Sequence, residues 1–519
     1  MGRADHSRAK QVLVAMTLAN AMILVDQTAV PLAIPSIMKQ FGVGSATAQW
    51  VLNASLLTLA GFLVLGGRLG DLFGRRRMFL LGSVLFTAAS AFGGLAPRFE
   101  ILLAARVVQG MGGALMLPSS VAILTASTPT AERGRALGAM GGIAAIAGAL
   151  GPTIGGLLTS AFSWRLVLLI NVPLAIACVV VTLTAVPDDA REGEHPPVDV
   201  LGAVLLFVSI VALVFGLTET QSASALSVEV WGALVLSLVA AVAFIVRERH
   251  APVPLMDLAL LRRTPNYLGA TISQGLAGMA EMGLGLLFPL LLILNLGLSP
   301  AIAGLALIPT TIPMILLSTT AGRWYDRAGG RPPLVVGFGV LAVAGVAMFF
   351  GAHGGSYWTL LPGLLLFGSG LALILTVNDP VSLDSLDDAQ DGEASGVSAT
   401  AEQAGGAIGI AGLYALFHAD YVHRLHVLVA GSGKTMTAQQ GAQLKDALGA
   451  AEQTGLQPQH FNQSLVGFLR PAYDASISGY GVAFLAVSVI AVIGVIATGV
   501  LVRRPLLVID IGDPAVSPD

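Results

Sequence analysis

Apolar residues fill the chain in long runs that short polar stretches separate. Fourteen runs reach the roughly 17 to 25 residues that a helix needs to cross about 30 Å of hydrocarbon, and none shows the strict alternation of a β-strand. They cover residues 12–34, 49–69, 78–96, 101–125, 136–160, 166–186, 199–218, 230–247, 268–292, 301–321, 332–351, 358–378, 392–418 and 479–503. Because a lipid-facing backbone must satisfy its own hydrogen bonds, we predict an all-α integral membrane protein with fourteen spans.

Composition agrees with a membrane protein and excludes several functions. Hydrophobic residues make up 55% of the 519 residues and charged residues 11%, whereas soluble proteins carry about 25% charged residues. The net charge of −3 offers no basic face for nucleic acid. A single cysteine, Cys178, excludes an intramolecular disulfide and any multi-cysteine metal site. We expect no metal, no cofactor and no enzymatic activity, since spaced His/Cys ligands and nucleophile motifs are missing from the sequence.

The placement of arginine and lysine predicts the topology. Basic residues concentrate in alternate connecting segments, which the positive-inside rule assigns to the cytoplasm. The N-terminus is then inside, an even number of spans returns the C-terminus to the cytoplasm, and the long segment 419–478 lies outside. Within that segment, LVAGSGKTMT (428–437) ends like a phosphate-binding loop, but Leu428 stands where the first glycine belongs. We therefore expect no use of ATP.

Two polar segments reveal an internal repeat: GGRLGDLFGRRR (66–77) and AGRWYDRAGGRP (321–332). Gly67, Asp71, Gly74 and Arg76 recur as Gly322, Asp326, Gly329 and Arg331, each 255 residues later (326 − 71 = 255). Six spans need only about 200 residues, so the offset requires an insertion. We predict a six-helix bundle over 1–190, an inserted helix pair over 191–250 and a second six-helix bundle over 251–519. A parallel repeat is the architecture of transporters that rock around a central site.

Four stretches carry a resemblance to a known family. GRLGDLFGRRR joins the second and third spans, RVVQGMGGA (106–114) lies in the fourth, GALGPTIGG (148–156) in the fifth and LVDQTAVPLAIP (24–35) in the first. Together they resemble the major facilitator superfamily, and within it the fourteen-span drug:proton antiporter group. The resemblance implies two six-helix bundles plus two inserted helices in a bacterial cytoplasmic membrane, acting as a monomer. It also implies proton-driven export of amphipathic drugs or antibiotics.

The resemblance assigns a latch to the repeated loop motif. Its members are Gly67, Asp71, Gly74, Arg75 and Arg76, with Asp326 and Arg331 in the second copy. Asp71 would cap a helix N-terminus or pair with an arginine, and so hold the outward-facing state. The alternative is that the arginines merely anchor the span to anionic lipid.

The glycine-rich motif of the fifth span is expected to form an interhelical seal that favours export. It consists of Gly148, Gly151, Pro152, Gly155 and Gly156. Proline bends the helix and the glycines let another helix approach closely. Ordinary helix packing would account for the same residues.

Four charged residues inside predicted spans are the candidate site: Asp26, Arg106, Glu281 and Glu402. An ionised group at the bilayer centre costs at least about 2.5 kcal/mol, and by default it marks a pathway or a proton relay. Helix rise places Asp26 and Arg106 at similar depths, so that they can pair directly or through water. A carboxyl that moves between a buried setting and an arginine can bind and release a proton. The alternatives are a static Asp26–Arg106 pair, a substrate-only role for Glu281 and a packing role for Glu402.

The expected partners are a lipophilic small molecule, protons and membrane lipid. Cations would be preferred if Glu281 or Asp26 faces the cavity. The alternative function is a proton-coupled symporter or importer of a small metabolite on the same fold. The fifth-span glycine and proline cluster argues against it.

Overall fold

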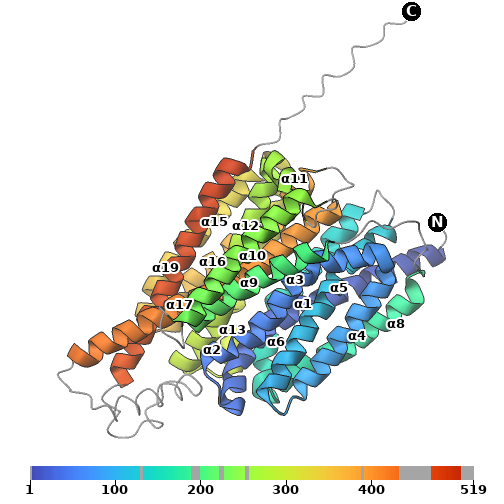
Figure 1. Ribbon diagram of the computed structural model, residues 1–519. Coiled ribbons are helices and arrows are strands. Elements are labelled where there is room, and N and C mark those ends of the chain that lie inside the picture. Colours follow the sequence, from blue (N-terminus) through green and yellow to red (C-terminus); the bar gives the residue numbers. More distant parts are fainter. Residues whose placement is uncertain are drawn as a thin grey trace, which may run out of the picture.

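The computed structural model describes residues 3–128, 133–188, 199–220, 227–251, 256, 258–386, 391–431 and 469–503. All the regular elements in these residues are helices. Most of them are long and lie side by side (Figure 1). The prediction of an all-α chain is confirmed for the part of the chain that the structure describes.

The first helices form an N-terminal bundle. Its members are α1 (Arg3–Phe41), α2 (Ser45–Ala48), α3 (Trp50–Phe73), α4 (Arg75–Gly94), α5 (Phe99–Ala126), α6 (Arg133–Ala161), α7 (Arg165–Leu169) and α8 (Asn171–Ala185). The helix α1 packs mainly on α6, and α4 and α3 both pack on α5. Gly74 has φ 101° and makes the tight turn from α3 into α4, a backbone conformation that favours glycine.

The second group of helices forms a C-terminal bundle. It contains α11 (Leu258–Arg263), α12 (Pro265–Leu290), the π-helical turn η2 (Leu291–Asn295), α13 (Pro300–Ala306), α14 (Ile308–Ala328), α15 (Arg331–His353), α16 (Tyr357–Leu383), α17 (Asp391–Gly431) and α19 (Leu469–Leu501). Here α12 packs on α17 and α15 on α16. Gly329, with φ 73°, turns α14 into α15 as Gly74 turns α3 into α4.

Two helices stand between the bundles in the sequence, α9 (Val200–Glu219) and α10 (Val228–His250). The helix α9 packs on α10, on α3 and on α17, so it contacts both bundles. Asp199 caps α9 by accepting a hydrogen bond from Gly202 N, and it pairs with Arg247 of α10 at 3.0 Å. Burial opposes ionisation of Asp199, but the hydrogen bonds from Arg247 and Gly202 outweigh it and hold its pKa below the usual value.

Twelve helices in the described residues are long and apolar enough to cross a membrane. The other two predicted spans, 49–69 and 392–418, lie in α3 and α17, which are not among those twelve. In α3 the side chains from Trp50 to Leu63 are described without a gap, and this stretch is apolar but shorter than a span. In α17 polar residues such as Glu402 and Gln403 interrupt the apolar ones. The predicted count of fourteen spans is therefore not confirmed.

The predicted outer segment 419–478 is partly helical. The helix α17 continues to Gly431, well past the predicted span end at residue 418, and α19 begins at Leu469. Residues 432–468 lie outside the described residues, and so does the Gly-Lys-Thr of the phosphate-loop-like stretch.

The two bundles repeat their closest helix contacts. A Cβ at Gly112 of α5 would stand 2.7 Å from the carbonyl oxygen of Gly82 in α4, and one at Gly370 of α16 would stand 2.9 Å from that of Gly337 in α15. Such close backbone approaches need residues without side chains. The offset is 255 for the third helix of each bundle (337 − 82) and 258 for the fourth (370 − 112).

The apolar core joins the bundles mainly at one end of the molecule. The largest cluster combines α1 residues from Ala29 to Met38 with Ala48 of α2, α3 residues from Val51 to Leu57 and a long stretch of α12. A second cluster, around Met16 and Phe79, contains residues of the N-terminal bundle alone. A third, formed by Leu261, Tyr267 and Val397, belongs to the C-terminal bundle alone. The bundles thus share a large core where α1 ends. Nearer the start of α1 they meet in a smaller cluster, in which Leu59, Leu63 and Ala114 pack with Ala399 of α17.

Candidate functional site

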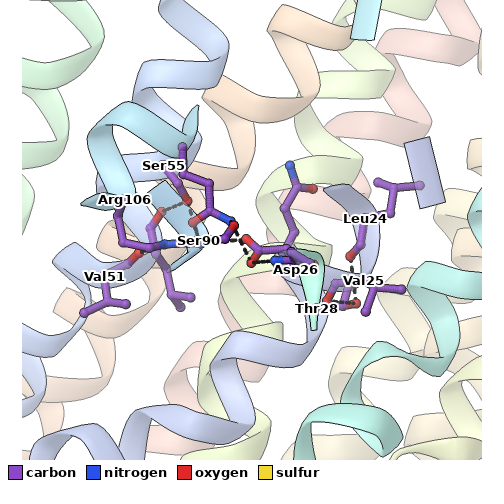
Figure 2. A network of polar contacts seen from close by, with 12 residues as sticks. Leu24, Val25, Asp26, Thr28, Val51, Ser55, Ser90 and Arg106 are labelled. Carbon is purple, nitrogen blue, oxygen red and sulfur yellow. Dashed lines mark hydrogen bonds and ion pairs between the residues drawn. The ribbon is translucent and has the colours of Figure 1, made fainter. Parts of the chain in front are cut away.

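Asp26 of α1 is the centre of a buried polar network in the N-terminal bundle (Figure 2). This residue is 4% exposed. Arg106 Nη1 of α5 donates to Asp26 Oδ2 at 2.6 Å. Gln109 Nε2 and Asn171 Nδ2 donate to Asp26 Oδ1 at 3.0 and 2.9 Å. Both carboxylate oxygens are therefore satisfied, and one of them faces a full positive charge.

Arg106 is equally well satisfied although it is only 1% exposed. Its Nε donates to the Val51 carbonyl oxygen at 2.8 Å and its Nη2 to Ser55 Oγ at 2.6 Å. Gln109 accepts from Arg106 Nη1 at 2.6 Å, and its Nε2 also donates to Ser90 Oγ at 3.0 Å. The network draws on five helices, α1, α3, α4, α5 and α8. It leaves the paired charges neutral overall, as burial requires.

A small pocket lies beside this network. Asp26, Gln27, Ser55 and Gln109 line it together with apolar side chains such as Phe86. Sequence reasoning chose Asp26 and Arg106 for this site and missed its amides. The signal for Gln109 was present, since it lies three residues after Arg106 in the fourth-span motif and so on the same helix face.

The other two candidates, Glu281 and Glu402, come together in the C-terminal bundle. Gln274 Nε2 of α12 donates to Glu402 Oε2 of α17 at 2.5 Å, and Asn378 Nδ2 of α16 donates to Gln274 Oε1 at 2.6 Å. Glu281 of α12 is near enough to Glu402 for their charges to interact. Asp379, which accepts a hydrogen bond from Ser398 Oγ at 3.4 Å, also acts on Glu402. Sequence reasoning missed Asp379, which lies just beyond the predicted twelfth span and still within α16.

One side-chain hydrogen bond connects the two groups of candidates across the bundles. Gln27 Nε2 of α1 donates to Gln403 Oε1 of α17 at 3.1 Å. Gln27 follows Asp26 in the sequence and Gln403 follows Glu402. The carboxyls of the two bundles therefore lie on either side of a direct contact between α1 and α17.

The loop motif predicted as a latch is only partly described. Asp71 lies in α3, but its side chain is outside the described residues. Arg76 pairs with Asp188, beyond α8, and Arg76 Nη2 donates to the Leu183 carbonyl oxygen at 3.1 Å. This tie between the start of α4 and the end of α8 was not predicted.

In the second copy of the motif, no ion pair joins Asp326 to Arg331 among the described residues. Asp326 lies in the last turn of α14 and Arg331 begins α15. The Tyr325 hydroxyl instead donates to the carboxylate of Asp384, just after α16. The second copy is thus tied to the end of its fourth helix, whereas the first is tied to the end of the sixth span.

The glycine motif of α6 packs against both bundles. Gly148, Gly151 and Gly155 face Leu24, Thr28 and Ala29 of α1, and Thr28 Oγ1 donates to the Gly148 carbonyl oxygen at 2.7 Å. Gly156, one residue further, faces Pro300 at the start of α13 in the other bundle. A Cβ at Gly304 of α13 would stand 2.5 Å from the carbonyl oxygen of Pro152.

Two hydrogen bonds support this contact between α6 and α13. Thr153 Oγ1 donates to the Gly304 carbonyl oxygen at 3.2 Å, and Ala301 N donates to Ser160 Oγ at 2.8 Å. The fifth-span motif therefore forms close contacts within its own bundle and also between the bundles.

The repeat offset relates the two sites, a relation that sequence reasoning missed. Glu281 stands 255 residues after Asp26, so it holds the same position in α12 that Asp26 holds in α1. With the offset of 258 that applies to the fourth helix of each bundle, Arg106 and Gln109 correspond to Leu364 and Phe367. The acidic residue is repeated, but its arginine and its amide are not.

Comparison with known proteins identifies the family. The family model described as Major Facilitator Superfamily matches residues 16–410. The multidrug resistance protein Stp of Mycobacterium tuberculosis is 34% identical over 375 residues, covering 72% of this chain and 69% of Stp. The tetracenomycin C resistance and export protein of Streptomyces glaucescens is 36% identical over 326 residues, covering 63% and 60%. The multidrug efflux pump LfrA of Mycolicibacterium smegmatis is 28% identical over 492 residues, covering 94% and 96%.

Solved structures show the same fold. A bacterial homologue of the human lysosomal transporter Spinster, in an inward-facing and occupied conformation, superposes with a TM-score of 0.64 at 16% identity, covering 96% of this chain and 97% of that one. The matched family model covers more than half of the chain, including the Asp26 network and the carboxyls of α12 and α17. The chain belongs to the Major Facilitator Superfamily.

Proposed function

We propose that the protein exports amphipathic drugs or antibiotics across a bacterial cytoplasmic membrane in exchange for protons. The curated relatives support the cargo class, since their names describe multidrug resistance, efflux and antibiotic export. The observation that carries the coupling is the set of charged residues held inside apolar helices: Asp26 with Arg106 in one bundle, Glu281 and Glu402 in the other. Such groups are costly in a membrane and are retained for transport.

In this proposal fourteen helices cross the membrane and both termini lie in the cytoplasm. The large shared core where α1 ends then closes the outer side, and the smaller contact between the bundles where α1 begins is the one that has to break for the inner side to open. A cavity open to the cytoplasm is the state that loads an exported drug. The protein works as a monomer, because each chain contains both bundles around the central site.

The driving force is the proton gradient, with no cofactor. Proton binding from outside and proton release inside change the charge of a carboxyl of this set, and the bundles rock between two packed arrangements. The α6 motif seals the outer side in the inward-open state through Gly156 and Gly304. Asp71 and the arginines of the loop motif latch the opposite state at the inner side. The cargo is lipophilic, with a preference for cations.

The direction of transport is the test of export against the importer alternative. A pH gradient, acidic inside, is imposed on inside-out membrane vesicles. Uptake of a lipophilic cationic dye such as ethidium is then followed by fluorescence. We expect uptake into the lumen that stops when nigericin collapses the pH gradient, because the lumen corresponds to the outside of the cell. Dye movement out of the lumen along with protons would instead indicate a symporter.

A further inference from the structure

We propose that the exchange of a proton for the cationic group of the drug takes place at Glu281, and that its repeat counterpart Asp26 acts with Arg106 as a positioning pair. This inference rests on the proposed function of proton-driven drug export. It divides the charged set on which the proposed function rests: Glu281 changes its charge during the cycle, and Asp26 with Arg106 does not.

The equivalence of the two positions rests on packing as well as on sequence. The glycine contacts fix the offset at 255 for the third helix and 258 for the fourth. The fifth helices agree to within about one helical turn: a Cβ at Gly151 of α6 would meet Thr28 of α1, and one at Gly409 of α17 would meet Met279 of α12. These pairs differ by 258 (409 − 151) and 251 (279 − 28), so α12 packs on α17 much as α1 packs on α6. Glu281 and Asp26 therefore occupy matching places in the two bundles.

Charge balance distinguishes the two carboxyls. Asp26 receives three hydrogen bonds, one of them from a guanidinium that is itself fully engaged. At the places of Arg106 and Gln109 the second bundle has Leu364 and Phe367, both buried. No described residue donates a hydrogen bond to Glu281, and the charge that acts on it is the like charge of Glu402. Asp26 is thus neutralised internally, whereas Glu281 is not.

The other charges around Glu281 do not supply a partner. On α16 the charged group that reaches this region is Asp379, which is acidic as well. On α1 it is Asp26, already paired with Arg106. The described arginines of α11 and α19 stand at helix ends or, for Arg503, just beyond one, and Arg424 of α17 lies 22 residues after Glu402 and pairs with Asp420. Two neighbouring carboxyls without a cation cannot both stay ionised at low cost, so one holds a proton until a cation takes its place.

A hydrogen-bonded chain that ends at Glu402, the neighbour of Glu281, can receive a donor. It runs from Asn378 through Gln274 to Glu402. Asn378 is 0% exposed, and its Oδ1 has no hydrogen-bond partner among the described residues. A buried acceptor without a donor costs free energy that an ammonium or amidinium group would recover. The site thus offers carboxylate and amide oxygens and no donor charge, the chemistry of an organic cation site.

The exchange step balances in charge. In the inward-open state the drug cation binds to the Glu281 carboxylate, and the proton that the carboxyl held passes to cytoplasmic water. In the outward-open state the drug leaves, and a proton from the outer medium returns to the carboxyl. Each cycle therefore carries one proton in for the positive charge carried out at this site. Asp26 and Arg106 keep the same net charge throughout.

The test compares a variant without the Glu281 charge with a variant in which Asp26 and Arg106 are both replaced by uncharged residues. Ethidium-driven proton release is measured with wild type, Glu281→Gln, Glu281→Asp and the double variant Asp26→Asn/Arg106→Gln, each reconstituted in sealed liposomes. We expect Glu281→Gln to lose at least about tenfold in proton release per ethidium, while Glu281→Asp retains part of it. The double variant is expected to export more slowly, yet to release the same number of protons per ethidium as wild type.

Each contrary outcome is informative. Proton release retained by Glu281→Gln, or lost by a folded double variant, overturns the assignment while leaving proton-driven export intact. If the double variant does not accumulate in cells, the test uses purified Glu281→Gln alone. The assignment requires that this variant no longer releases a proton when ethidium binds. A wild type that moves no ethidium under an imposed pH gradient overturns the proposed function, and the assignment with it.

Discussion

Replacing Asp26 by asparagine is expected to abolish drug export and to destabilise the folded protein by about 3 to 5 kcal/mol. The change removes the negative partner of Arg106, a side chain that is 1% exposed and cannot move its charge to water. Gln109 and Asn171 would also lose the charged acceptor that they share. The melting temperature in detergent and drug susceptibility in an efflux-deficient host measure the two effects.

The matched control removes both charges. Asp26→Asn/Arg106→Gln leaves no buried charge alone, so we expect its melting temperature to recover most of the loss. A single Asp26→Asn variant as stable as wild type would contradict the geometry of Figure 2. A double variant less stable than the single one would show that the amides cannot fill the place of the ion pair.

A side chain at Gly156 is expected to have the second largest effect. A Cβ at this position would overlap the carbonyl oxygen of Pro300, a backbone atom of the other bundle. Gly156→Ala should therefore separate α6 from α13, destabilise the packed state by about 1 to 3 kcal/mol and let protons leak through the membrane. Passive proton entry into liposomes that contain the variant measures the leak.

The same helix provides the control. Gly142 of α6 has open space where its Cβ would be, so Gly142→Ala should export drugs as wild type does. If Gly156→Ala seals and exports as well as Gly142→Ala, the contact between α6 and α13 is not a seal. A leak in both variants would point to the bend of α6 rather than to its contact.

Much of the fold could be predicted from the sequence, because apolar runs of membrane length leave the backbone little choice but helix. The turn glycines could also be predicted, because Gly74 and Gly329 occur at matching places of the repeated motif. In the structure both have positive φ. The extension of α17 to Gly431 could not be predicted from the sequence. Its last turns mix charged and apolar residues, a pattern that fits either a helix or an exposed loop.

The site was predictable to the extent that a charge in an apolar helix stands out. Asp26, Arg106, Glu281 and Glu402 were identified in this way, and helix rise placed Asp26 and Arg106 at the same depth. Amides such as Gln109 and Asn171 were not identified as site residues, because an uncharged polar residue in a span can serve many structural roles. The contact of Gln27 with Gln403 depends on how two bundles meet, which no local pattern in the sequence records.

Sealed liposomes with purified protein give the most direct test of proton-driven export. An inward proton gradient is imposed and the accumulation of ethidium in the external medium is followed before and after an uncoupler is added. The account predicts uphill ethidium export that ceases when the gradient collapses. Export that continues at the same rate and to the same final gradient would contradict it.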